Sequence, residues 1–447
     1  MTTTRTLRCG SVLSLLSAVL LALFFPLSLS ATDGHFLHGA GPVNEAMGGA
    51  DTGLCLDATG SIAWNAACTV SFNGRRFEIH GTGFAAWRSL SSTVNANAFG
   101  AGIPGGTLSG TTVSHRNASF MPGMAFVYHP QGSRNAYHAA MLAVSGFGVQ
   151  YNQNMDFSNP ILTAQAPNGF GFGAIKSNYA LVEVPIGVSR ALSDKLSVGA
   201  SVVPSLSMLM VVPAPFSAPV MAGSTSPYYM SAGYNAPAIG GGFNVGVHYK
   251  INQVTSIGVA YHSPIWFQQF SWKRKDLAGG DHTLTFQMNL PQLVSVGVGI
   301  SPSKKTRIGV DARWFDYANT AGFSKVGYNS DGSVAGFGWR SIWAVGGGVQ
   351  QQVSASTKLI AGYNYSGNPV PAQYTFFNTP APAIVQHHVS AGMVQTVRGW
   401  DVNTTYYHAF QNSITGPWIS GQGAIPGTSV TSKMSENSLT VGLSKSF

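Results

Sequence analysis

Apolar and polar residues alternate with a period of two in many short segments of the chain, as in β-strands with two different faces. The last ten residues show this most clearly, because Leu439, Val441, Leu443, Lys445 and Phe447 share one face and small polar residues fill the other. No stretch combines a helical period with helix-capping residues. The pattern predicts about fourteen strands, at residues 69–85, 119–131, 134–148, 175–191, 195–212, 239–251, 254–268, 282–301, 305–317, 338–352, 356–367, 384–397, 399–412 and 434–447.

The connections between these strands alternate in length. Long segments of roughly 15 to 35 residues alternate with short turns, as in outer-membrane barrels with long extracellular loops and short periplasmic turns. An even number of strands also brings both chain ends to the periplasmic side. The short turns are residues 129–135, 190–197, 249–256, 301–306 and 352–358.

The composition agrees with a transmembrane barrel. Charged residues make up 9% of the chain, against about 25% in a soluble globular protein. The chain has 54 glycines and a mean hydropathy of +0.13. After the first thirty residues no window offers the roughly 20 apolar residues of a membrane-spanning helix. We therefore expect an all-β fold, an antiparallel barrel of about 14 strands with an N-terminal plug, or hatch, in its lumen.

The start of the chain has the layout of a secretory signal peptide. Arg5 and Arg8 precede an apolar run from Val12 to Leu29, and small residues follow at the expected cleavage point. We expect residues 1–30 to be removed, residues 31–68 to form the plug and residues 69–447 to form the barrel. The mature chain then carries 22 basic and 15 acidic residues, a net charge of +7 that favours contact with anionic lipopolysaccharide over nucleic acid.

Cys55 and Cys68 are the two cysteines of the mature chain, and both lie in the predicted plug. Because exported proteins fold in an oxidising compartment, we expect a disulfide between them, with two free buried thiols as the alternative.

The predicted plug resembles the N-terminal hatch of FadL-type outer-membrane transport proteins, which carry long-chain fatty acids or aromatic hydrocarbons. The resemblance rests on the segment GAGPVNEAMGGA at 39–50 and on Asn65, Ala66 and Ala67, which stand where the family has an Asn-Pro-Ala motif. Ala66 replaces the proline. Residues 290–318 and 362–373 are similar to a strand pair and a Pro-Val-Pro loop entry of the same family. The resemblance implies passive uptake of hydrophobic molecules.

Two predicted extracellular loops are unusually apolar. In the resembled family the third and fourth loops form a docking groove, and here the basic residues Lys273, Arg274 and Lys275 follow the aromatic ones. Alternatively, the aromatics form the outer interface belt and the basic run pairs with lipopolysaccharide phosphates. The candidate docking residues are Phe216, Met221, Tyr228, Tyr229, Trp266, Phe267, Phe270, Trp272, Lys273 and Lys275.

Several charged residues alternate with apolar ones on the predicted strands. A charge on the lipid face near the membrane midplane costs about 2 to 4 kcal/mol, so these side chains are expected to face the lumen and hold the plug. Alternatively, Arg313 or Arg340 binds a substrate carboxylate. The predicted lumen charges are Arg76, Glu78, Glu183, Asp311, Arg313 and Arg340.

The sequence thus predicts an outer-membrane channel for hydrophobic small molecules. Long-chain fatty acids are the first candidate, because the basic run matches an anionic head. The alternatives are an aromatic-hydrocarbon channel, a surface protein without transport activity and a barrel enzyme. No GxSxG, HExxH or Walker-type motif is present, so we expect no enzyme activity, cofactor or metal. The expected partners are the substrate, outer-membrane lipid, lipopolysaccharide and the barrel insertion machinery, with a monomeric barrel and no nucleic acid.

Overall fold

A computed structural model describes residues 33–116, 118–222 and 226–447 of the protein. Fourteen antiparallel strands close into a barrel, in which the first strand, β1 (Gly74–Val94), pairs with the last, β23 (Thr428–Ser446). The predicted all-β barrel is confirmed. The predicted signal peptide, residues 1–30, lies outside the described residues. Among the described residues, no helix is long and apolar enough to cross a membrane.

Three of the fourteen strands consist of two segments. These are β2 (Leu108–Val113) with β3 (Ala118–His129), β5 (Ile175–Glu183) with β6 (Ile186–Ala191), and β11 (Thr255–His262) with β12 (Trp266–Phe267). The remaining strands of the wall are β4 (Asn135–Tyr151), β7 (Leu196–Val212), β10 (Ala232–Lys250), β15 (Leu293–Ser303), β16 (Thr306–Phe315), β17 (Ile342–Gln352), β18 (Thr357–Ser366), β19 (His387–Val397) and β20 (Trp400–Gly416).

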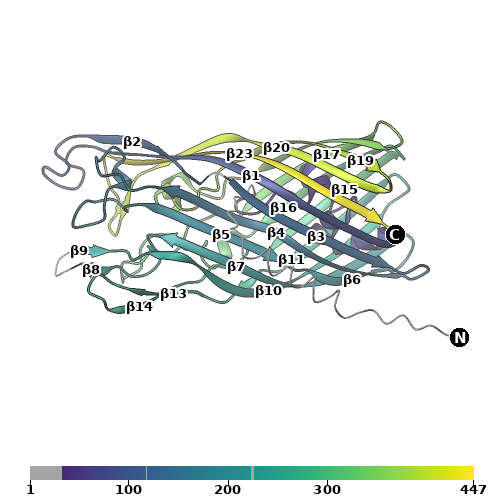
Figure 1. Ribbon diagram of the computed structural model, residues 1–447, viewed down its shortest axis with the longest axis horizontal. Helices are drawn as coiled ribbons and strands as arrows, with labels where there is room; N and C mark the ends of the chain where they lie inside the picture. The colour runs from purple at the N-terminus through teal and green to yellow at the C-terminus, as the bar shows by residue number, and fades with distance from the viewer. Residues whose placement is uncertain (1–32, 117, 223–225) are drawn as a thin grey trace.

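The two ends of the barrel differ, as Figure 1 shows. Short turns and the carboxyl terminus lie at one end, which we assign to the periplasm. The other end carries long loops with three small hairpins, β8 (Val220–Ala222) with β9 (Ser226–Tyr228), β13 (Phe270–Lys275) with β14 (Asp281–Phe286), and β21 (Ile419–Ser420) with β22 (Gly423–Ala424). The loops also contain the 3₁₀ helices η2 (Pro160–Leu162), η3 (Tyr317–Asn319) and η4 (Ala372–Asn378).

Several predicted strand boundaries differ from the structure, and two of the differences have a clear local reason. The first strand starts at Gly74 and not at residue 69, because Asn65 caps the 3₁₀ helix η1 (Ala66–Ser71) in front of it. The predicted strand at 282–301 splits into loop strand β14 and wall strand β15. Pro291 lies between them and cannot donate to a strand ladder.

The N-terminal residues form a plug inside the barrel. Its α-helices α2 (Pro42–Ala46) and α3 (Ala58–Trp64) and the 3₁₀ helix η1 lie within the lumen in Figure 1. Helix α2 packs against β18, β19, β20 and β23, while η1 packs against β4, β6, β7 and β10. The plug therefore contacts strands around most of the wall.

Candidate functional site

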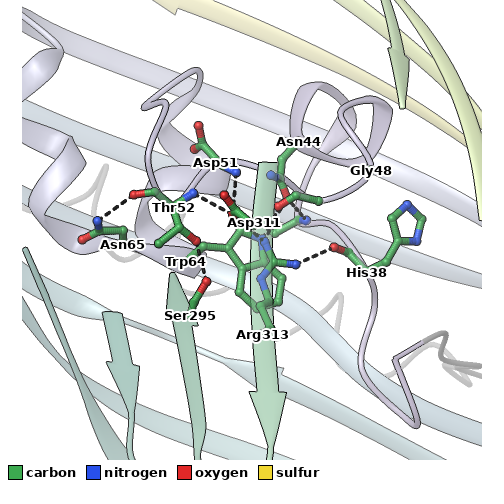
Figure 2. Close-up of polar contacts among 12 residues, drawn as sticks. His38, Asn44, Gly48, Asp51, Thr52, Trp64, Asn65, Ser295, Asp311 and Arg313 are labelled. Carbon is green, nitrogen blue, oxygen red and sulfur yellow. Dashed lines mark hydrogen bonds and ion pairs between the residues drawn. The ribbon is translucent and has the colours of Figure 1, made fainter. Parts of the chain in front are cut away.

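Two charged residues of β16 bind the plug from the wall (Figure 2). The carboxylate of Asp311 accepts the backbone N–H groups of Asp51 and Thr52 at 2.9 and 2.8 Å. The guanidinium of Arg313 donates to the carbonyl oxygens of His38, at 3.0 Å, and Gly49, and lies 3.7 Å from the ring centroid of Trp64. Arg313 and Asp311 also form an ion pair of 3.3 Å. Both side chains thus bind the plug, while Nε of Arg313 is buried without a hydrogen-bond partner among the described residues.

A second carboxylate of the wall caps a plug helix. Glu78 of β1 accepts the N–H groups of Ala58 and Thr59, at 3.0 and 2.9 Å, and the hydroxyl of Thr59 at 2.7 Å. These donors belong to the first turn of α3, which has no partners within the helix for them. Arg76 pairs with the same carboxylate at 2.6 Å. The two predicted lumen charges therefore act as an anchor for α3.

Helix α2 is held by the last strands of the chain. The carboxylate of Glu45 accepts the hydroxyl hydrogens of Ser438, at 2.6 Å, and Thr440. The carbonyl oxygens of Pro42 and Ala46 accept the hydroxyls of Thr405, at 2.6 Å, and Ser390, at 2.9 Å. Polar side chains on the inner face of β19, β20 and β23 thus position this helix.

Glycines of the wall let the plug backbone approach closely. A Cβ at Gly346 would overlap the carbonyl oxygen of Gly48, and a Cβ at Gly258 would overlap that of Thr52. Gly48 itself has a φ of +66°, a conformation that favours glycine. Since the contact is backbone to backbone, the plug cannot move as a body without losing it.

A disulfide between Cys55 and Cys68 closes the chain around α3. The two residues are 13 positions apart, and their Cα atoms lie 5.1 Å from one another. The bridge limits how far this part of the plug can unfold.

A cavity lies between the plug and the side of the barrel formed by β4, β10 and β11. The non-atom space there is about 530 Å³, which includes space open to solvent. Its lining is mainly apolar, with the carboxyl of Glu183 and the imidazole of His262, and no lysine or arginine of the described part of the chain reaches it. The lining residues are Phe36, Leu37, Gly39, Ala40, Ala63, Trp64, Ala143, Val144, Glu183, Asn244, His262, Ser263, Ile265, Leu290, Pro291 and Leu293.

A second, small cavity adjoins the first and shares Leu37, Gly39, Ala40 and Ala143 with it. It extends to Met121 of β3 and Leu142 of β4, two strands that pair only from Gly123 and Leu142 toward the periplasm. Above this point a backbone hydrogen bond joins the two chain segments again, from the N–H of His115 to the carbonyl oxygen of Gln150 at 2.8 Å. Between these points, β3 and β4 share no ladder among the described residues.

Residues 35–37, here called the N-terminal segment, lie along the free edge of β4 beside this gap. Phe36 forms an antiparallel bridge with Ser145, and the N–H of Leu37 donates to the carbonyl oxygen of Val144 at 3.0 Å. The N–H of Gly146 and the hydroxyl of Ser145 both donate to the carbonyl oxygen of His35, at 3.1 and 2.7 Å. The segment thus takes the place of β3 along this part of β4.

Aromatic rings lead from the extracellular loops to that segment. The rings of Phe216 and Phe286 stack at 4.5 Å, and Phe286 lies 6.2 Å from Phe337. Phe337 contacts Phe323 at 5.6 Å, and Phe323 contacts His35 at 4.8 Å. A third, small cavity lies under the loops, and none of the described residues that line it is charged. The rings thus form a continuous apolar contact from the loops to the plug.

The structure brings only part of the predicted docking set together. Phe270 and Trp272 are buried, and Phe216 contacts Trp272 at 5.6 Å. Phe267 is buried, and Tyr228 and Tyr229 are partly buried in the loops. By contrast, Trp266 is 54% exposed on the opposite face of β12 from Phe267, apart from this cluster, and Met221 is exposed. The exposed residues Lys273 and Lys275 lie on the β13–β14 hairpin.

The same hairpin carries its own ion pairs. Lys275 pairs with Asp281 at 2.9 Å, and His282 lies 2.8 Å from the carboxylate of Asp276. The hydrogen bond from His282 holds the pKa of Asp276 below its ordinary value. The basic run is thus partly neutralised.

One of the predicted lumen charges, Arg340, does not lie on a wall strand. Arg340 lies before the start of β17 and is exposed, with its guanidinium 2.9 Å from the carbonyl oxygen of Asn368. The predicted strand began too early, because residues 338–341 belong to the preceding loop. Glu183 does lie on a wall strand and lines the first cavity.

The sequence reasoning missed the aromatics of the loop before β17 and the segment at His35. Phe323, Phe337 and Trp339 are buried around Tyr317 and His35. The high density of aromatic residues between 315 and 343 was the available signal. It does not show, however, which way these rings point.

Comparisons with known proteins agree with this architecture. A family model described as "Outer membrane protein transport protein (OMPP1/FadL/TodX)" matches residues 43–394. The toluene transporter TodX of P. putida is 16% identical, with a TM-score of 0.65 over 92% of this chain and 99% of that one. The toluene transporter TbuX of Ralstonia pickettii is 18% identical, with a TM-score of 0.66 and the same coverage. A Pseudomonas aeruginosa FadL homologue is 14% identical, with a TM-score of 0.67 over 93% of this chain and 100% of that one. No curated protein matches the sequence.

Proposed function

The chain belongs to the OMPP1/FadL/TodX family of outer-membrane transport proteins, and from that premise we propose that it takes up neutral hydrophobic small molecules such as monoaromatic hydrocarbons. The coarser function, an outer-membrane channel for hydrophobic substrates, follows from the family. The choice of neutral substrates rests on the chemistry of the cavities.

The observation that carries this proposal is that, among the described residues, no lysine or arginine lines the three cavities between the loops and the plug. The first cavity offers the carboxyl of Glu183, the second that of Glu45, and the third no charge at all. Arg313 is close to Trp64 but is already bound by Asp311 and two plug carbonyl oxygens. A fatty-acid carboxylate would have to enter these cavities unpaired and beside another carboxyl group, which is strongly unfavourable. A neutral hydrocarbon gains about 25 cal/mol per Å² of buried apolar surface without that cost.

The route that we propose begins at the rings of Phe216, Phe286 and Phe337, here called the aromatic loop cluster, and leads past Phe323 and His35 to the first cavity. From there the second cavity continues to the gap between β3 and β4. The segment at Phe36 and Leu37 is joined to β4 beside the gap by a short bridge. The rest of the plug is held by buried polar contacts and by close backbone contacts at glycines of the wall. Exit through the wall therefore requires less rearrangement than expulsion of the plug.

Long-chain fatty acids, the first candidate from the sequence, have one observation in their favour. Lys273 is exposed on the β13–β14 hairpin, directly after the buried Trp272. A carboxylate head could stay at this outer position. Exposed ion pairs are worth only about 0 to 1 kcal/mol, however, and such a head would still have to leave the hairpin to enter the lumen.

Uptake of labelled toluene and labelled oleate tests the proposal in a Gram-negative host that lacks its own hydrophobic-substrate channels. We expect the protein to accelerate toluene uptake and to leave oleate uptake near the vector level. Ala143→Phe, which fills the shared part of both cavities, should reduce toluene uptake, while Ala391→Phe on the outer face of β19 should not. Rapid oleate uptake without toluene uptake would overturn the choice of neutral substrates.

A further inference from the structure

A groove runs along the outer, membrane-facing surface of the barrel, separate from the internal cavities. It crosses β6, β7, β10 and β11 and is open to its surroundings along its length. Its surface is almost entirely apolar. The outward-facing side chains of the groove are Val188, Arg190, Val198, Ala200, Val245, Val247, Val259 and Tyr261.

The small side chain of Ala200 explains why the wall is hollowed there. Ala200 lies in register with Val188 on one side and Val245 on the other. Tyr261 follows Val245 in the same row. The methyl group of Ala200 therefore forms a floor between larger neighbours.

Behind this floor a single β-sheet separates the groove from the plug. On the inner surface, a Cβ at Gly199 would contact the backbone of Ala66, and one at Gly246 would overlap the side chain of Asn65. The groove thus lies directly outside the plug residues Asn65 and Ala66.

Cationic groups mark the periplasmic end of the groove. Arg190 lies at the end of β6 in register with Asn135. Its guanidinium donates a hydrogen bond to the side-chain oxygen of Asn135 at 3.4 Å. Arg134 and Lys195 lie in the adjoining turns, next to one acidic residue, Asp194. Within the described part of the chain, Arg190 forms no ion pair.

We propose that this groove binds an anionic phospholipid of the inner leaflet of the outer membrane. One acyl chain lies along the valines and over Ala200, and the headgroup phosphate lies against Arg190. Three observations support this occupant: the groove faces lipid, its polar end is at the periplasmic side where phospholipid headgroups lie, and that end carries an excess of positive charge. Lipopolysaccharide would place its phosphates at the opposite end of the barrel.

Native mass spectrometry of the full-length mature barrel tests the proposal. The protein is purified in a mild non-ionic detergent, stripped of lipid, and mixed with phosphatidylglycerol and phosphatidylethanolamine of matched chain length. We expect one retained phosphatidylglycerol, with at least a five-fold preference over phosphatidylethanolamine. Equal retention of both lipids by the wild type would overturn the proposal.

Two variants with matched controls separate a built site from the general lipid annulus. Ala200→Phe should abolish the retained lipid, and the control Ala312→Phe should keep it. Ala312 also faces outward between two valines, Val296 and Val345, but lies outside the groove. Arg190→Gln should reduce the headgroup preference to near one, while Arg398→Gln in the β19–β20 turn should preserve it. The proposal is wrong if Ala200→Phe and Ala312→Phe have the same effect, or if the preference survives in Arg190→Gln. Since Arg190 is exposed at a strand end, its variant remains a test even if Ala200→Phe fails to fold.

Discussion

The N–H of Leu37 donates to the carbonyl oxygen of Val144 at 3.0 Å, and this bond makes the N-terminal segment, in place of β3, a neighbour of β4. The segment hydrogen-bonds to the edge of β4 where β4 no longer pairs with β3. Opening the path from the cavities to the gap therefore means breaking this short bridge.

Cross-linking the segment to β4 should block transport. Phe36→Cys with Ser145→Cys places two cysteines at paired positions of an antiparallel bridge, within the usual range for a disulfide. We expect toluene uptake to fall after oxidation and to recover after reduction. The wild type treated with the same reductant controls for the native disulfide. Normal uptake by the cross-linked protein would argue against exit through the β3–β4 gap.

Removing the carboxyl group from the first cavity should change substrate preference. Glu183→Gln keeps the size of the side chain and removes the group that would repel a fatty-acid carboxylate. We expect the ratio of oleate to toluene uptake to rise several-fold. An unchanged ratio would mean that Glu183 has no part in selectivity.

Loss of Arg313 should loosen the plug. Removing one partner of a buried ion pair costs about 3 to 5 kcal/mol, and Arg313→Met also removes the contacts to His38, Gly49 and Trp64. Cells with this variant should admit a polar chromogenic β-lactam faster than cells with the wild type. Arg340→Met, at an exposed position, is the matched control. Equal permeability of the two variants would contradict the assigned role of Arg313.

The aromatic loop cluster should matter more for uptake than the basic hairpin. An aromatic pair is worth about 0.5 to 1.5 kcal/mol beyond its buried area, so Phe216→Ala with Phe286→Ala should reduce toluene uptake at low concentration by roughly 2- to 10-fold. Lys273→Ala with Lys275→Ala should have a smaller effect. Both proteins should keep their heat-modifiable mobility in gel electrophoresis. Normal uptake by the correctly folded aromatic variant would exclude this cluster from the route.

Strand periodicity was sufficient to predict the barrel and much of its inner face. The two faces of each strand meet different surroundings, so the positions of Glu78, Asp311 and Arg313 follow from alternation alone. The plug could be inferred from residues such as Ile62 and Trp64, which need an apolar environment.

The paths and openings could not be predicted in the same way. The gap beside β4 depends on a backbone bridge at Phe36. The residue types do not show which backbone groups will hydrogen-bond to each other. The loops follow no period either, so the sequence indicated that Trp266 and Trp272 belong to one apolar region without showing that one is exposed and the other buried.

The contacts of helix α2 also set an order of events during folding. The hydroxyls of Ser438 and Thr440, which bind Glu45, lie 393 and 395 residues further along the chain. Contacts of such sequence separation form late, because the intervening chain must first be brought together. Helix α2 is therefore synthesised early but acquires its native partners late.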